Sequence, residues 1–333
     1  MPVLVTGATG FLGSALTRRL VDDGATVRIL RRVRSRLDLL GPAADRVEHA
    51  VGDVTAPETL AAAFEGVTHV YHAAAYVGFG GRKARERLWR VNVEGTAHVV
   101  NAALRAGVQR LVHTSSMAAF GRPEGTDVVI DEATPWQPSR ANSAYARSKY
   151  AAEMEVQRGV AEGLDAVLVN PALLFGIGRP GENTRRIVES VRTGAVPAIP
   201  TGGTNVVDVL DVAEGHVRAM ARGRTGARYF MGSENLSWRA IFETLAAALG
   251  VPPPRRTLPP AAATAFATAA EAFAFLTRSE PRFTREMARQ TARFYQYDHR
   301  RAVEELGCTF RPFSATARRI ADALGKDPQA AGV

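Results

Sequence analysis

A tyrosine and a lysine four residues apart, Tyr145 and Lys149, are the two side chains of this sequence best placed to do chemistry together. Residues four apart on a helix lie on one face, so the ammonium group would stand beside the phenol. A cation there favours the phenolate and lowers a phenol pKa that is otherwise about 10. The pair therefore predicts acid–base chemistry at an oxygen atom, which a serine upstream, Ser115 or Ser116, could hold from the other side. The alternative is an accidental pairing. The chain has seven tyrosines and only three lysines, so chance predicts on the order of 0.1 such pairs.

A glycine-rich turn near the start of the chain could bind phosphate. The segment Thr6-Gly7-Ala8-Thr9-Gly10-Phe11-Leu12-Gly13 follows the apolar run 3–5 and precedes an amphipathic stretch at 14–23. This order predicts a strand, a tight turn and a helix whose first amide groups face an anion, which is how the pyrophosphate of a dinucleotide is bound. An ordinary strand-to-helix turn could carry the same glycines, and the Tyr145–Lys149 pair is the second signal that favours a dinucleotide.

The elements that would position these residues alternate along the first half of the chain. Apolar runs predict strands at 3–5, 26–30, 47–51, 69–71, 110–113 and 166–169, and helical patterns lie at 12–23, 57–64, 87–106 and 143–162. Alternation of this kind predicts an α/β fold, namely a Rossmann-type doubly wound parallel sheet. After residue 171, turns rich in glycine and proline predict a smaller interleaved C-terminal substrate cap. We assign 1–172, with a returning segment at about 206–232, to a nucleotide-binding domain, and 173–205 and 233–330 to the cap.

The order of the motifs resembles that of extended short-chain dehydrogenases/reductases, in the NAD-dependent epimerase/dehydratase family. The matching segments, which lie within about residues 1–245, are Thr6–Gly13, Gly52-Asp53-Val54, His72-Ala73-Ala74-Ala75, Val91-Asn92-Val93-Glu94-Gly95-Thr96, Thr114-Ser115-Ser116, Tyr145–Lys149, Asn170-Pro171-Ala172 and Asp211-Val212-Ala213. Within the family, the chain most resembles dihydroflavonol-4-reductase-like proteins, and the hopanoid-associated sugar epimerases are similar in pattern.

The resemblance implies roles for individual residues. Ser116, five residues before Gly121, would polarise a substrate carbonyl, Tyr145 would donate a proton, and Lys149 would bind the cofactor ribose. These three are the predicted catalytic residues. The residues predicted to contact the cofactor are Gly7, Thr9, Gly10, Phe11, Leu12, Gly13, Arg31, Arg32, Asp53, Val54, Ala73, Ala74, Ala75, Asn92, Thr114, Tyr145, Lys149, Asn170, Pro171 and Ala172.

The end of the second predicted strand distinguishes NADP from NAD. An acidic residue there would bind the adenosine ribose hydroxyls of NAD, but the chain has Arg31 and Arg32, with no acid before Asp38. A guanidinium group binds phosphate bidentately, and Arg32 matches the arginine with which dihydroflavonol-reductase-like proteins contact the 2′-phosphate. We therefore predict NADP as the cofactor, with NAD as the second choice. A basic surface loop without a role in binding is the alternative interpretation.

Composition excludes several classes of function. Hydrophobic residues make up 46% of the chain and charged residues 23%, as in a globular protein. The net charge of +9 comes from scattered arginines without a basic tail, so we expect no nucleic-acid partner. The seven histidines have no ligand spacing, which predicts no metal site, and the lone cysteine, Cys308, excludes an intrachain disulfide. A first strand at residue 2 or 3 leaves no room for a signal peptide, so we expect a cytoplasmic protein.

Two expectations concern assembly and membranes. The resemblance implies a homodimer formed through helices near 92–106 and 144–160. The segment 261–276 is nearly all apolar but shorter than the about 20 residues that a transmembrane helix needs. We therefore predict no transmembrane span and a buried or interfacial helix, and peripheral membrane contact stays open.

Three hypotheses for function follow. The first is an NADP-dependent reductase whose small-molecule carbonyl substrate is a ketone or aldehyde. Five phenylalanines suggest a hydrophobic substrate, although core packing explains them equally well: Phe175, Phe266, Phe273, Phe275 and Phe294. The second is a nucleotide-sugar or other sugar epimerase or dehydratase with tightly bound NAD(P). Against it, Met117-Ala118 stand where dehydratases carry Asp-Glu, and Thr204 stands where nucleotide-sugar enzymes carry an arginine. The third is a non-catalytic NADP-binding regulator, which would not need to keep both Tyr145 and Lys149.

Overall fold

A parallel sheet forms the centre of the molecule. The structure is a computed structural model that describes residues 2–78, 81–123, 128–139, 142–277 and 284–325. Within these residues the central sheet has seven strands in the order β11-β7-β5-β4-β1-β2-β3, and each neighbouring pair is parallel. The strands are β1 (Val3–Thr6), β2 (Val27–Arg31), β3 (Glu48–Val51), β4 (His69–His72), β5 (Arg110–Thr114), β7 (Ala166–Pro171) and β11 (Arg228–Met231). The predicted doubly wound sheet is confirmed, and the chain reverses its winding between β1 and β4.

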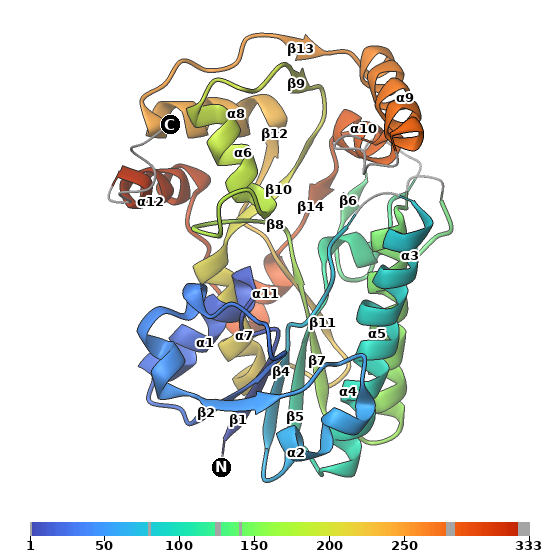
Figure 1. Cartoon of the computed structure of the whole chain (residues 1–333), viewed down its shortest axis with the longest axis vertical. Helices are drawn as coiled ribbons and strands as arrows, with labels where there is room; N and C mark the ends of the chain where they lie inside the picture. Colours follow the sequence, from blue (N-terminus) through green and yellow to red (C-terminus); the bar gives the residue numbers. More distant parts are fainter. Residues whose placement is uncertain (1, 79–80, 124–127, 140–141, 278–283, 326–333) are drawn as a thin grey trace.

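Helices cover both faces of this sheet (Figure 1). One layer consists of α1 (Phe11–Asp22), α7 (Val209–Arg222) and α11 (Arg300–Leu306). The other contains α2 (Ala61–Phe64), α3 (Arg82–Leu88), η3 (Trp89–Glu94), α4 (Gly95–Arg105) and α5 (Ala144–Ala161). Shorter helical turns are η1 (Asp38–Arg46), η2 (Pro57–Thr59) and η4 (Met117–Phe120). The single helix predicted at 87–106 is therefore replaced by α3, the π-helical η3 and α4 in succession.

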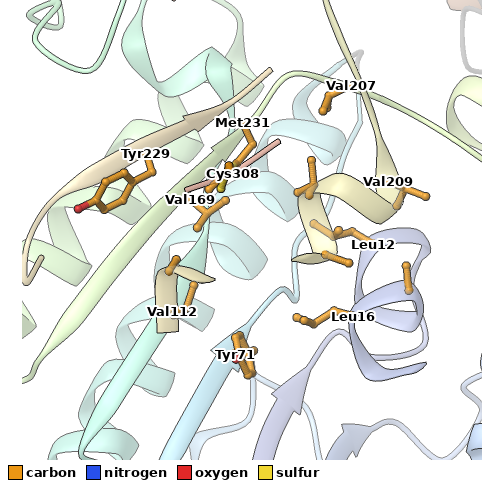
Figure 2. Close-up of a cluster of buried hydrophobic side chains, with 14 of the residues drawn as sticks. Leu12, Leu16, Tyr71, Val112, Val169, Val207, Val209, Tyr229, Met231 and Cys308 are labelled. Atoms are coloured by element: carbon orange, nitrogen blue, oxygen red, sulfur yellow. The ribbon is translucent and has the colours of Figure 1, made fainter. Parts of the chain in front are cut away.

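Continuous apolar strands are explained by burial on both sides. Figure 2 shows the core between α1, α7 and the sheet, in which Leu12 and Leu16 of α1 belong to the same buried cluster as Val112 and Val169. Alternate strand residues such as Leu4 and Leu168 face the opposite core, against α4 and α5. Fully burying one such side chain contributes about 1.5–3 kcal/mol. The two cores therefore hold the strands in register, and the carboxyl ends of β1, β4, β5 and β7 meet at one edge.

The cap has a small sheet and a core of its own, above the carboxyl edge in Figure 1. Its sheet contains β8 (Leu173–Phe175), β10 (Gly203–Asp208) and β12 (Glu234–Ser237), and its helices include α6 (Asn183–Arg192), α8 (Trp238–Leu249) and α12 (Phe313–Gly325). Two further strand pairs are β9 (Ile199–Pro200) with β13 (Thr257–Leu258), and β6 (Val129–Ile130) with β14 (Gln296–Tyr297). Phe175 is fully buried in this core with its ring 4.8 Å from that of Phe313, so core packing explains this phenylalanine.

The chain returns to the central sheet more than once. Helix α7 packs on α1, and β11 completes the sheet beside β7, within the segment 206–232 that was expected to return. Helix α11 also packs on α7 and β11, and Cys308 lies in the same core. The predicted cap range 233–330 thus includes a segment that belongs with the sheet, and the division into two domains stays a prediction.

The apolar segment at 261–276 forms the helix α9 (Pro260–Leu276), which packs on α10 (Arg285–Ala292). Ala263 and Ala267 are buried there with Ala288, whereas Phe266 and Phe273 are more than half exposed. The side chain of Phe275 lies outside the described residues. Among the described residues, no helix has both the length and the apolarity needed to cross a membrane.

Candidate active site

The three predicted catalytic residues come together at the carboxyl edge of the sheet. Ser116 follows β5, and Tyr145 and Lys149 lie on the first turns of α5. The hydroxyl of Ser143 accepts a hydrogen bond of 2.9 Å from the amide of Ala146 and so caps this helix. This cap fixes where the helix begins. As a result the phenol and the ammonium group lie on one helix face beside the end of β5.

Lys149 is almost completely buried, and its ammonium group is held by the backbone. Its Nζ donates a hydrogen bond of 2.7 Å to the carbonyl oxygen of Thr114. Burial lowers the pKa of Lys149 to about 8, and the nearby carboxylate of Glu153 opposes part of that shift. The charge is therefore fixed at the end of β5 and titrates close to neutral pH.

Tyr145 differs from the expectation in its protonation. Burial raises the pKa of the Tyr145 phenol, and a hydrogen bond with the Ser116 side chain opposes that shift. The lowered pKa expected from the neighbouring Lys149 is therefore not found, since burial disfavours the phenolate. The phenol is therefore protonated at neutral pH and can donate a proton.

The two serines take different positions. Ser116 is half-buried and begins η4, with its Oγ accepting a hydrogen bond of 3.2 Å from the amide of Ala118. This bond does not use the hydroxyl proton of Ser116, which is therefore available for a hydrogen bond toward Tyr145. Ser115 is buried and faces Glu153 beneath the site. The structure thus places Ser116, and not Ser115, next to the phenol.

The glycine turn has the shape and donors that a dinucleotide pyrophosphate requires. Gly7 has φ +71°, and a Cβ there would lie 2.5 Å from the backbone of Ala73 and Ala74. A Cβ on Gly13 would lie 2.1 Å from the carbonyl oxygen of Gly7. The cap residue of α1, Gly10, has no side chain to satisfy the first amide groups of the helix, which leaves them as donors for an anion. The residues present therefore fit the phosphates of an NAD-type cofactor.

We predict that Gly13→Ala will abolish tight cofactor binding and destabilise the protein. The new methyl group would overlap the carbonyl of Gly7, and overpacking of this kind costs about 1–3 kcal/mol or more. Thermal unfolding and titration with NADPH would measure both effects. Gly81→Ala is the matched control, since Gly81 has φ −71° and nothing lies within 4 Å of its added Cβ. Unchanged binding in Gly13→Ala would contradict the assigned turn.

The end of β2 carries the two arginines predicted to select NADP. Arg31 donates from Nε to the ring nitrogen of His49 at 2.9 Å, so its orientation is fixed. Arg32 is exposed, and its backbone amide donates to Ser35 at 3.1 Å. Asp38, the nearest following acid, is paired with Arg36 at 2.9 Å. Arg32 is therefore the arginine with the more accessible guanidinium group.

Other predicted cofactor residues line the same edge, but several use their polar atoms within the protein. Asp53 accepts two bonds of 2.9 Å from the amide and hydroxyl of Thr55. The amide of Asn92 binds both backbone groups of Tyr76, at 2.7 and 3.0 Å, and Ser148 at 3.0 Å. All the predicted cofactor contacts stay predictions, including those of Asp53 and Asn92 and those of Thr9, Phe11, Leu12, Val54, Ala75, Pro171 and Ala172.

A buried polar layer under the site was not predicted from sequence. Glu153, one turn beyond Lys149, accepts a bond of 2.6 Å from Asn170, whose amide also donates to the carbonyl of Ser116 at 3.1 Å. His216 binds the hydroxyl of Thr114 at 2.8 Å. The spacing of Tyr145, Lys149 and Glu153 by four residues was the available signal. This layer holds the ends of β5 and β7 together below the phenol.

Two smaller findings complete the site. Asp208 caps α7 by accepting a hydrogen bond of 2.8 Å from the amide of Leu210. Asp211 forms an ion pair of 2.7 Å with Arg311. Within the described ranges, no group of three or more His, Cys, Asp or Glu side chains could hold a metal ion.

Comparisons with known proteins agree with this geometry. The model of the NAD dependent epimerase/dehydratase family matches residues 3–232. The chain is 35% identical over 326 residues to a putative dihydroflavonol 4-reductase of Synechocystis sp., covering 96% of this chain and 92% of that protein. It is 35% identical over 312 residues to sterol demethylase protein B of Methylococcus capsulatus, covering 92% and 93%. The crystal structure of gox2253 superposes with a TM-score of 0.84 at 35% identity, covering 97% of this chain and 98% of that one. The chain belongs to the NAD dependent epimerase/dehydratase family and is an NAD(P)-dependent oxidoreductase of the extended short-chain dehydrogenase/reductase type.

Proposed function

We propose that this protein is an NADP-dependent reductase of a ketone or aldehyde. When bound, a reduced nicotinamide supplies the hydride. Tyr145 donates its phenolic proton to the substrate oxygen, and the hydroxyl of Ser116 donates a hydrogen bond to the same atom. Lys149 binds the cofactor ribose and keeps a positive charge near the phenol. Charge develops on the substrate oxygen only as hydride arrives, so both hydroxyl donors act most strongly in the transition state.

The protonation of Tyr145 fits its proposed role as the proton donor. Burial raises the pKa of this phenol, so it carries a proton at neutral pH. The reduced substrate thus receives one hydride and one proton, which balances the conversion of a carbonyl to an alcohol.

The observation that carries the choice of reaction is the environment of Thr204. This side chain is nearly buried, and its Oγ1 lies 4.0 Å from the sulfur of Met117, directly after Ser116. The resemblance places a diphosphate-holding arginine at this position in nucleotide-sugar enzymes. An uncharged wall of Thr204 and Met117 would bind a sugar diphosphate poorly and suits an apolar carbonyl compound.

Three arginines of the cap are already engaged in other contacts. Arg179 is paired with Asp38 at 2.7 Å, and the largely buried Arg185 with Glu189 at 2.8 Å. Arg186 donates to the carbonyl of Gly181 at 3.1 Å. A sugar epimerase or dehydratase with tightly bound NAD(P) is therefore the second candidate, and the family itself is the observation that favours it.

The substrate is proposed to be a hydrophobic small molecule. Phe294 is partly exposed and pairs with Gly203, and its ring lies where a Cβ of Gly203 would be. Neighbouring residues of a strand face opposite sides, so this ring lies on the other side of β10 from the Thr204 side chain. Phe266 and Phe273 lie on the outer face of α9 instead. The support for a hydrophobic substrate is therefore the uncharged pair of Thr204 and Met117.

A panel of carbonyl substrates with NADPH oxidation as the readout tests the proposal. We expect the protein to purify largely free of nicotinamide and to consume NADPH in equal amount with a ketone or aldehyde, because a reductase must release its cofactor each turnover. Retained cofactor, together with interconversion of a UDP-hexose without net NADPH loss, would replace this function with the second candidate.

We predict that Arg32→Ala will reduce the preference for NADPH over NADH by about ten- to a hundredfold. A charge-assisted bond to phosphate contributes about 1.5–3 kcal/mol, and NADH lacks the 2′-phosphate. Fluorescence titration with both cofactors measures the ratio. Arg34→Ala, at an exposed arginine of the same loop, is the matched control. Equal affinity of the unchanged protein for both cofactors would refute NADP specificity.

The proposals for the oligomeric state and the cellular location rest on the resemblance to the family. A homodimer is proposed through α4 and α5, which pack on each other and leave Met154 of α5 partly exposed. We further propose a cytoplasmic protein without a nucleic-acid partner, and peripheral contact of α9 with membranes stays open. Light scattering at micromolar concentration tests the dimer, and a monomer there would contradict it.

A further inference from the structure

Arg179 links the cap to the cofactor edge of the sheet. It lies in the loop after β8, with a side chain that is 11% exposed. Its Nη2 donates a hydrogen bond of 3.0 Å to the carbonyl oxygen of Thr9, in the glycine turn, and a hydrogen bond of 2.7 Å to the carboxylate of Asp38. Its Nε lies 3.0 Å from both carboxylate oxygens of Asp38. One guanidinium group thus joins three segments that are far apart in sequence.

The loop that carries Arg179 is held tightly at both ends. On one side it lies against α1, where a Cβ on Gly176 or Gly178 would come within 3.2 Å of the ring of Phe11. On the other side the amide of Gly181 donates to Glu189 of α6 at 3.1 Å. Movement of the cap relative to the glycine turn must therefore act on this arginine.

The position of the Arg179–Asp38 pair matters for an anionic ligand. Asp38 follows the loop that carries Arg31 and Arg32, and an unpaired carboxylate there would repel the 2′-phosphate that these two arginines are proposed to bind. Arg179 neutralises Asp38 from the cap side, and Arg36 binds the same carboxylate at 2.9 Å. Arg179 also adds positive charge beside the glycine turn.

We propose that Arg179 is a positioning residue that fastens the cap-side loop over the cofactor edge, slows release of the dinucleotide and shields the 2′-phosphate from Asp38. This inference rests on the proposed use of NADP, and it adds a second determinant of cofactor retention to Arg32. The two effects have different physical origins: the fastening depends on the bidentate bonds, and the shielding depends on the net charge at Asp38. Variants of the two partners therefore separate them.

The test is the dissociation rate of NADPH, measured by stopped-flow fluorescence after mixing the complex with excess NADP⁺. Arg179→Ala should release NADPH about tenfold faster or more, since it loses several charge-assisted bonds, and its affinity should fall more for NADPH than for NADH. Asp38→Asn should also speed release but keep the preference for NADPH, because no negative charge is exposed. The double variant should release quickly and recover the preference.

Controls make each outcome decisive. Arg82→Ala removes an exposed arginine that is paired with Glu86 at 3.5 Å far from this loop, and it should leave both quantities unchanged. Thermal unfolding without cofactor shows whether Arg179→Ala is folded. If this variant is not folded, Asp38→Asn tests the same Arg179–Asp38 bonds by changing the carboxylate instead of the guanidinium group. A wild-type protein that fails to bind NADPH overturns the proposed cofactor. Binding with release rates within twofold of wild type in both single variants overturns the role of Arg179 alone.

Discussion

Tyr145→Phe should lower kcat for carbonyl reduction by about 10²–10⁴-fold, the usual contribution of general acid catalysis. The phenylalanine ring keeps the packing of Tyr145 on α5 but has no proton to give to the substrate oxygen. Affinity for NADPH should stay within about twofold, because the proton is needed only as charge develops on that oxygen. Steady-state kinetics on the best substrate of the panel, together with NADPH titration, gives both numbers.

Tyr150→Phe is the matched control for this change. Tyr150 lies on the same helix, with its ring stacked 4.3 Å from Trp136, and a phenylalanine preserves that stacking. It should keep full activity. Full activity in Tyr145→Phe would refute the acid role, whereas loss of activity in both variants would indicate disturbance of α5 rather than loss of a proton donor.

The gathering of the site residues at the carboxyl edge of the sheet could be predicted from sequence. It depends on local motifs and on one rule, that the carboxyl ends of parallel strands lie at the same edge. Each apolar run that was read as a strand forms one, and the carboxyl ends of parallel strands meet at one edge. The glycine turn, the serine after β5 and the tyrosine on α5 are therefore brought together whatever the details of the cap. The confirmed sheet gives this part of the prediction its physical basis.

Contacts between distant segments could not be predicted in the same way. Asp38 and Arg179 are separated by 141 residues, and no local pattern links them. The return of α11 to the sheet has the same origin, since its amphipathic pattern does not say which surface it covers. The buried position of Phe175 likewise depends on the folded cap, which is why an aromatic residue near the site motifs was open to two interpretations.

The phenol pKa shows how burial can reverse a correct local argument. The sequence places Lys149 next to Tyr145, and a cation alone would lower the pKa of the phenol. The fold also buries the phenol, and this burial raises its pKa. The ammonium group of Lys149 donates to the carbonyl of Thr114. Spacing reveals which groups are neighbours, whereas the degree of burial depends on the whole structure.

Lys149→Met should lower kcat/KM for reduction by about a hundredfold and weaken NADPH binding as well, because the ammonium group is proposed to serve both the ribose and the phenol. In the wild type, kcat/KM should fall as pH rises through about 8, where Nζ loses its proton. In the variant the rate should be low throughout, and this fall should be absent. Lys83→Met, at an exposed lysine of α3, is the control and should keep the wild-type profile.

A second readout separates this electrostatic role from a structural one. The pKa of Lys149 is lower in the folded protein than in the unfolded chain, about 8 against an ordinary 10.5. Between these values the unfolded chain binds more protons, so the free energy of unfolding contributed by this group rises with pH over that window and is constant below it. Methionine has no such proton and removes the cost of burying a charge. Lys149→Met should therefore fold at neutral pH and lack the rise between pH 8 and 10.5. A variant with the wild-type pH dependence of both kcat/KM and unfolding would show that Lys149 is not the group that titrates.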